Sequence, residues 1–285
     1  MPVSTWAVAE PQKLTFDEPV TALKVRIVNG TVNVVGTDEP TARLEVSSVE
    51  GPPLLVTQED GVLTVAYEDL AWQNLLKWLD RKEWRRTAVV SLAVPAGSTV
   101  EVGVVGAGAF VSGVRGRTEV RGVTGDTTLV KLSGPVGAET VSGSVEAQSV
   151  TGDLRFHSVS GDLTVVEGAG ASVKADSVSG GMVLDLNPTG KPTDIRLTTV
   201  SGEIAIRLPH PADARVEANT ASGSVSNGFE DLRVSGQWGS KKITGTLGSG
   251  TGTLRATTVS GSIALLRRPP AEDEPYEAQP AGKVL

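Results

Sequence analysis

Three aspartates, each directly after a glycine, are the first residues in this chain that could do chemistry. Asp126, Asp153 and Asp162 would line the edges of a repeating structure. Stacked carboxylates can bind calcium, and paired carboxylates can cleave glycosidic bonds. The corners between them carry Pro135 and Ser144, so the series is broken, and the calcium nonapeptide G-G-x-G-x-D is absent. We therefore interpret the three aspartates as turn-stabilising residues.

The other candidates are two histidines, the serines and two glycine-rich loops. His157 falls on an outward strand position and His210 lies between prolines, without a third metal ligand in sight. The chain has no cysteine, which excludes thiol catalysis and disulfides. The loops at 103–108 and 248–252 lack the phosphate-binding pattern, and the serines beside glycines belong to a repeat. We expect no enzyme activity, no catalytic residue, no cofactor, no metal and no evident small-molecule substrate.

The elements that would position these residues form a repeat of nine. The unit V-[S/T]-G-x-[V/L]-x-[apolar] recurs, as in residues 150–158, "VTGDLRFHS". Its alternation of apolar and polar residues predicts a short half-buried strand, and its glycine predicts a corner with positive φ. The predicted structural corner glycines are Gly125, Gly134, Gly143, Gly152, Gly161, Gly180, Gly202, Gly223 and Gly261.

Two architectures compete for such a repeat. The corners could join antiparallel hairpins, or each pair of strands could form one coil of a solenoid that stacks in parallel on the next. Constant spacing favours the solenoid. We predict an all-β, single-stranded parallel β-helix over residues 20–266, preceded by an N-terminal segment at 1–19. Residues 267–285, acidic and rich in proline, are predicted to be disordered.

The phrases "VSGD", "VSGEIAIRLP" and "TTVSGSI" resemble a bacterial family of β-strand-repeat proteins that is labelled "putative adhesin" and is a domain of unknown function. The resemblance covers most of the chain, from about residue 20 to 266. It implies a parallel β-helix and supplies no catalytic residues. An adhesin label usually accompanies export, whereas this sequence shows no secretory signal.

Residues 68–86, "EDLAWQNLLKWLDRKEWRR", break the repeat and contain three of the five tryptophans. An apolar face with flanking Lys and Arg predicts an inserted amphipathic helix. Such a helix could cap the solenoid, dock a protein or a second copy, or attach to a membrane surface. The predicted interaction residues are Trp72, Leu75, Leu76, Trp78, Leu79 and Trp84.

Charge and hydropathy narrow the classes of partner. The formal net charge of −7 argues against nucleic acid. No apolar run is long enough to span a membrane and no signal sequence is evident, so we expect a cytoplasmic protein. The sequence predicts a non-enzymatic scaffold or protein-interaction module that could self-associate. The alternatives are a carbohydrate-binding or carbohydrate-active β-helix and a peripheral membrane protein.

Overall fold

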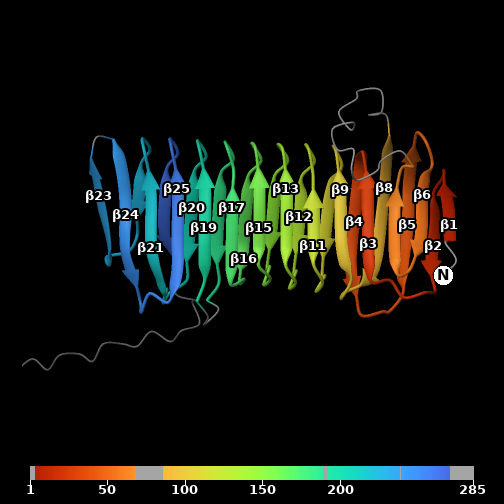
Figure 1. The fold of residues 1–285 in the computed structure, drawn as a ribbon, viewed down its shortest axis with the longest axis horizontal. Helices are drawn as coiled ribbons and strands as arrows, with labels where there is room; N and C mark the ends of the chain where they lie inside the picture. Colours follow the sequence, from red (N-terminus) through yellow and green to blue (C-terminus); the bar gives the residue numbers. More distant parts are fainter. Residues whose placement is uncertain (1–3, 69–85, 189–191, 238, 270–285) are drawn as a thin grey trace, which may run out of the picture.

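The fold is all-β and consists of two long sheets that enclose one core. A computed structural model describes residues 4–68, 86–188, 192–237 and 239–269. In this part of the chain, sheet A has fourteen strands and sheet B has twelve. Together they form an elongated β-solenoid whose strands lie across the long axis (Figure 1).

The strands of sheet A, in chain order, are β1 (Ser4–Val8), β3 (Ala22–Ile27), β6 (Leu54–Glu59), β7 (Val62–Ala66), β9 (Thr99–Val104), β11 (Thr118–Arg121), β13 (Val136–Thr140), β15 (Leu154–Ser158), β17 (Ser172–Asp176), β19 (Asp194–Thr199), β21 (Ala214–Thr220), β23 (Leu232–Gln237), β24 (Ser240–Leu247) and β25 (Gly252–Thr258). Those of sheet B are β2 (Gln12–Phe16), β4 (Asn29–Thr37), β5 (Ala42–Glu50), β8 (Thr87–Pro95), β10 (Gly108–Ser112), β12 (Thr127–Val130), β14 (Val145–Gln148), β16 (Leu163–Gly168), β18 (Met182–Leu186), β20 (Ile204–Leu208), β22 (Val225–Asn227) and β26 (Ile263–Arg267).

Period-two patterning drives each strand to bury one face. Along β19 exposed and buried residues alternate strictly, and β8 alternates in the same way over nine residues. The inward side chains are mostly Val, Leu, Ile and Ala, and the larger Phe156 is completely buried among them. Because every coil contributes the same kind of inward row, the rows merge into one continuous hydrophobic core.

The middle of the solenoid is regular and parallel. Val136 pairs with Leu154 in sheet A, and Val145 pairs with Leu163 in sheet B. Each pairing advances by 18 residues, which is two of the nine-residue units. The solenoid architecture and parallel stacking predicted from the repeat are therefore confirmed for this region.

The two ends depart from sequential stacking. At the C-terminal end, β25 lies between β19 and β21 (Figure 1), and in sheet B β26 lies between β20 and β22. At the N-terminal end, the coil formed by β3 and β4 lies between the coil of β7 and β8 and that of β9 and β10. Since each inserted coil has a neighbour on both sides, its backbone hydrogen bonds are made inside the stack.

The outermost strands are antiparallel, contrary to the prediction of a fully parallel helix. β1 pairs antiparallel with β6, β2 with β5, and β23 with β24. At the N-terminal end Trp6 and Phe16 meet edge to face, with ring centroids 5.4 Å apart, over the end of the core. An antiparallel hairpin at the end of the solenoid does not present the parallel coil edge on which a further coil would stack, so it can terminate the stack.

The inserted helix predicted at 68–86 falls almost entirely outside the described residues. Its six predicted interaction residues, Trp72, Leu75, Leu76, Trp78, Leu79 and Trp84, all lie there. The predicted disordered tail lies outside them too, apart from Arg267, Arg268 and Pro269. In the ranges that the structure describes, no helix is long and apolar enough to cross a membrane.

Candidate functional site

The corner glycines stack in two columns, one on each edge of the rod. Gly125, Gly143, Gly161, Gly180, Gly202, Gly261 and Gly223 follow one another along one edge, while Gly134 and Gly152 lie on the other. A Cβ added to Gly161 would lie 2.1 Å from the carbonyl oxygen of Gly143. No side chain fits there, because real Cβ atoms do not approach an oxygen so closely.

Glycine is therefore required at these corners because the backbones of neighbouring coils approach each other closely, and not because of the backbone conformation. The prediction of positive φ at the corner glycines was wrong, because none of the nine has it. Positive φ occurs instead at Lys131, Ser149 and Glu167, which repeat at intervals of 18 residues where sheet B strands end. The sequence repeat could not separate these two reasons, because both select glycine.

A column of buried and part-buried hydroxyls supports the first edge. At six of its seven glycines the hydroxyl of the residue three positions earlier accepts a hydrogen bond from the glycine N–H, and only Gly125, which follows Gly122 by three residues, lacks this acceptor. The donor–acceptor pairs are Gly143–Thr140 (3.0 Å), Gly161–Ser158 (2.7 Å), Gly180–Ser177 (2.9 Å), Gly202–Thr199 (3.1 Å), Gly261–Thr258 (3.0 Å) and Gly223–Thr220 (2.9 Å). The full motif is thus [T/S]-x-S-G, whose first residue was not predicted from the sequence although it repeats in register.

The serine before the glycine binds the neighbouring coil. Ser160 Oγ donates to the carbonyl of Val141 at 3.3 Å, and Ser179 Oγ donates to that of Val159 at 3.3 Å. The main-chain N–H of Ser160 donates to the same Val141 oxygen at 2.8 Å. These serines therefore bind the backbone of the preceding coil.

This pairing stacks the valines of the motif into an exposed row. The valine stripe, as we call it, consists of Val141, Val159, Val178, Val200 and Val259, with side chains of which 46–51% is exposed. Each contributes to the rod's edge and not to its core. Coils are about 4.8 Å apart, so the stripe is roughly 19 Å long.

A groove runs beside the first part of the stripe. It has a volume of about 390 Å³ and lies between Val123, Val141 and Val159 on one side and Arg121, Glu139 and His157 on the other. Arg121 Nε is 3.2 Å from Glu139 Oε2, and His157 Nδ1 is 3.6 Å from Asp176 Oδ2. Arg121 and Glu139 carry opposite charges on this wall, so the groove combines apolar valines with a polar rim on which these two charges offset each other.

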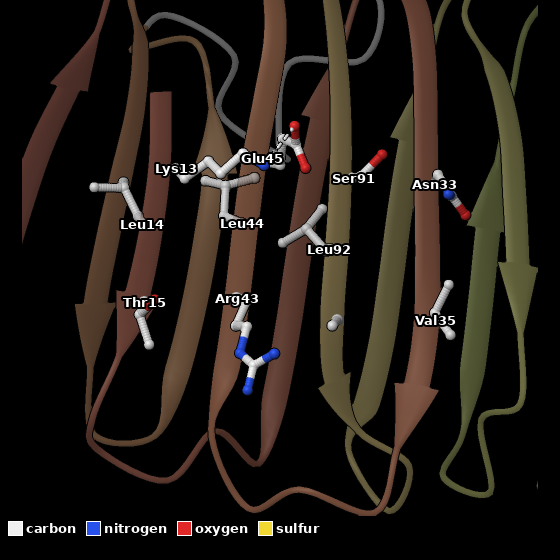
Figure 2. Close-up of a pocket in the computed structure, with 11 residues that line it drawn as sticks. Lys13, Leu14, Thr15, Asn33, Val35, Arg43, Leu44, Glu45, Ser91 and Leu92 are labelled. Carbon is white, nitrogen blue, oxygen red and sulfur yellow. Dashed lines mark ion pairs between the residues drawn. The ribbon is translucent and has the colours of Figure 1, made fainter. Parts of the chain in front are cut away.

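A second hollow lies on sheet B near the N-terminal end (Figure 2). It has a volume of about 340 Å³. β8 lies between β5 and β4 and contributes the small side chains of Ser91 and Ala93. The neighbouring side chains of β5, Arg43 and Glu45, are longer, so the surface is hollow over β8. Among the residues that line it, Glu45 is the single carboxylate and pairs with Lys13 at 3.2 Å. One paired carboxylate cannot supply the acid and base of a glycosidase.

The aspartates singled out in the sequence serve the corners. Asp126 Oδ1 accepts a hydrogen bond from the Ser144 N–H at 2.9 Å, and Asp162 Oδ1 accepts one from the Gly181 N–H at 2.7 Å. Asp153 lies on the opposite edge, after Gly152. The structure therefore confirms a turn role for two of them. Across the part of the chain that the structure describes, no three His, Cys, Asp or Glu residues are placed to hold a metal ion.

The two histidines lie in different surroundings. His157 belongs to the groove wall described above, whereas His210 precedes a cis peptide bond to Pro211 and its Nε2 lies 2.7 Å from the Arg267 guanidinium. In these contacts the partner of His157 is an aspartate and that of His210 is an arginine.

Two acidic groups near the C-terminal coil have lowered pKa values. Asp185 is buried and accepts a hydrogen bond from Arg207 Nε at 2.8 Å, which lowers its pKa, and the Arg268 guanidinium 3.6 Å away acts in the same direction. Hydrogen bonds from Thr251 and Ser249 lower the pKa of Asp213 to about 2. Both aspartates hold the inserted coil in place, because Arg268 and Thr251 flank it.

The described fold is a β-solenoid with a repeated [T/S]-x-S-G edge. Its C-terminal part, residues 184–266, matches the Toastrack DUF4097 domain. The resemblance to a β-strand-repeat domain of unknown function is thus confirmed over residues 184–266, which is the C-terminal part of the range from about 20 to 266 that the sequence phrases suggested.

Three solved structures are similar. A "putative cell adhesion protein" from Clostridium sporogenes is 13% identical, with 91% of this chain and 100% of that chain covered and a TM-score of 0.26. A "putative lipid binding protein" from Parabacteroides distasonis is 9% identical, with 92% and 98% covered and a TM-score of 0.41. A "putative adhesin" from Parabacteroides merdae is 8% identical, with 90% and 97% covered and a TM-score of 0.30. The comparison with curated proteins found no match.

Proposed function

We propose that this chain is a non-enzymatic β-solenoid scaffold that binds an extended segment of a partner protein along the valine stripe. The observation that carries the proposal is the stripe itself: five valines in successive coils, each about half exposed. A corner needs the glycine and the two hydroxyl residues of the motif, whereas the exposed half of each valine makes no contact inside the rod. An apolar row of this regularity fits a binding surface.

The size of the stripe favours a partner segment over a second copy. Five half-exposed valines present an apolar patch on the order of a few hundred Å². A stable dimer needs about 800 Å² from each partner. The stripe fits a narrower, transient contact in which apolar side chains of an extended segment lie along the edge and the groove rim supplies hydrogen bonds.

The test places a photo-crosslinking amino acid at Val159 or Val178 in the source cell and, as a matched control, at Val183. Val183 is also 50% exposed but lies on the outer face of sheet B. We expect one specific crosslinked protein from both stripe positions and none from Val183. The binding of that purified partner is then measured by calorimetry.

The double variant Val159→Ser/Val178→Ser should weaken the partner's Kd by about 5- to 150-fold, since burying the exposed halves of two valines is expected to contribute about 1–3 kcal/mol to binding. Val183→Ser should leave the Kd unchanged. Equal crosslinking at Val183, or an unchanged Kd in the double variant, would refute the stripe as the binding surface. A crosslink to a second copy of the chain, with a doubled mass in light scattering, would replace the partner segment by self-association.

A further inference from the structure

A column of positive charge runs along the outer face of sheet A, away from the valine stripe. Arg155 pairs in register with Lys174, Lys174 with Arg196, and Arg196 with Arg255. These four residues, which we call the cation ladder, lie on β15, β17, β19 and β25, four adjacent strands of the sheet (Figure 1). Their Cα atoms are therefore about 4.8 Å apart from coil to coil.

Such a ladder is unfavourable for the fold by itself. Like charges directly opposite each other on adjacent strands destabilise a sheet. The neighbouring column of the same face follows the opposite rule, with Arg121 beside Glu139 and His157 beside Asp176. Binding of a negatively charged group would reduce the repulsion among these four cations.

Half of the ladder is unneutralised. Lys174 lies 3.7 Å from Asp194, and Arg255 lies 3.1 Å from Glu217. Arg155 and Arg196 are exposed and have no ion pair within the described residues. The Cα atoms of these two residues are two coils apart, or about 9.6 Å.

We propose that the cation ladder binds the acidic, proline-rich segment of this same chain that follows Pro269. The segment reads "PAEDEPYEAQPAGKVL" from residue 270, with four carboxylates at 272, 273, 274 and 277 and one lysine at 283. Its charge is complementary to the ladder. This inference does not depend on the valine stripe or on any partner protein.

The spacing of the carboxylates fits the two free arginines. A proline-rich segment favours the polyproline II conformation, which has three residues per turn and a rise of about 3.1 Å per residue. Glu274 and Glu277 are three residues apart, so in that conformation they share one face at about 9.3 Å. The Cα atoms of Arg155 and Arg196 are about 9.6 Å apart. The match lets one carboxylate meet Arg196 while the other meets Arg155.

The chain leaves the solenoid near the ladder. β26 ends at Arg267, and the Arg268 N–H donates to Leu208 O at 2.9 Å. The Arg268 guanidinium donates to Leu186 O at 3.3 Å and also contacts Asn187. Leu186 ends β18, immediately before the corner that leads into β19 on sheet A. The last described residues thus lie at the corner where the ladder strands begin.

The remaining length is sufficient. Glu274 is five positions after Pro269, and an extended chain spans at most about 3.3–3.6 Å per residue, or roughly 17 Å in total. Arg196 is the third residue of β19 and lies one coil from Arg255. The path crosses from sheet B to sheet A (about 10 Å), runs two residues along the strand (about 6.7 Å) and crosses one coil (about 4.8 Å), which gives about 13 Å in a straight line. The segment can therefore reach the ladder without unfolding any strand.

The absence of cysteine from the sequence allows a clean distance measurement on the full chain. Thr198→Cys on the exposed face of β19 and Gln279→Cys in the acidic segment would each carry a nitroxide. Pulsed electron resonance at low ionic strength should then show one narrow, short-distance peak. The peak should vanish at 1 M salt, where the screening length falls to about 3 Å.

Variants decide whether the ladder is responsible. Arg155→Gln/Arg196→Gln should remove at least about half of the peak. The control Arg215→Gln/Arg233→Gln removes the same charge elsewhere on sheet A and should retain the peak. Arg155→Glu/Arg196→Glu should abolish the peak, and adding Glu274→Lys/Glu277→Lys should restore it.

A broad distribution in the parent chain, or a peak that survives loss of both arginines, would overturn the proposal. Loss of the peak on dilution with unlabelled chain would assign the contact to a second copy instead and would also overturn it.

Discussion

A single methyl group at a corner glycine tests the account of how the coils stack. In Gly161→Ala the new Cβ would lie 2.1 Å from the Gly143 oxygen and 3.0 Å from Thr140 Cγ2. The first neighbour is backbone and cannot rotate away. The two coils must move apart, and the hydrogen bond from the Gly161 N–H to Ser158 Oγ, 2.7 Å long, is then stretched as well.

The size of the effect follows from the contact. Inserting a methyl group into a packed site costs about 1–3 kcal/mol when side chains can adjust. Here a rigid backbone oxygen is the obstacle, so we expect about 3 kcal/mol or more. The entropy gained by replacing glycine offsets only about 0.4–1 kcal/mol. For a chain of this length the melting temperature should fall by roughly 5–10 °C.

The assay is urea unfolding followed by circular dichroism, with two companion variants. Gly97→Ala is the matched control, because nothing lies within 4 Å of its added Cβ and its φ is not positive. It should change the unfolding free energy by about 0.5 kcal/mol or less. Gly161→Asn separates the two reasons for glycine, since asparagine tolerates positive φ but still carries a Cβ. It should be at least as destabilising as Gly161→Ala. An unfolding midpoint of Gly161→Ala equal to that of Gly97→Ala would refute the reasoning.

Three further predictions concern other parts of the same framework. Thr199→Val should cost about 1–3 kcal/mol of unfolding free energy because the Gly202 N–H loses its acceptor, whereas Thr199→Ser should retain most of the stability in the same urea titration. Ser149→Gly should stabilise by about 0.5–1 kcal/mol because Ser149 has a φ of 52°, and a higher urea midpoint would show it. Asp185→Asn should cost about 1–2 kcal/mol at pH 7, since it leaves Arg207 without its charged partner. The folded-state pKa of Asp185 lies below its unfolded value, so this stabilisation is complete above the unfolded pKa and lost as pH falls through the folded pKa. Midpoints of parent and variant should therefore converge in acid.

The repeat alone predicts the solenoid, its coil length and most of its core. Apolar residues such as Leu154, Phe156 and Leu163 recur with period two between glycines nine residues apart, and all three are buried. Local patterning suffices because every coil makes the same contacts with its neighbours. The same regularity shows where Asp126 and Asp162 bind the corners.

The order of coils at the ends could not be read from the sequence. A unit such as residues 252–267 has the same pattern as its neighbours, so periodicity does not say which coil it pairs with. The connection from β20 to β21 and the hairpin of β23 and β24 together leave a gap into which β25 and β26 fit. That choice depends on loop lengths and long-range pairing, which a local pattern does not encode.

The surfaces proposed here were also decided by tertiary structure. The sequence identified charged and apolar residues singly, but the valine stripe and the cation ladder exist only because coils of 18 to 22 residues, and one inserted coil, bring them into register. Arg196 and Arg255 are far apart in the chain and adjacent in the sheet. By itself, the sequence determined which residues face inward and where the chain turns, since these depend on neighbours within a coil. Which outward residues meet was decided by the stacking of coils, since a strand's hydrogen bonds accept any partner whose register and length allow it.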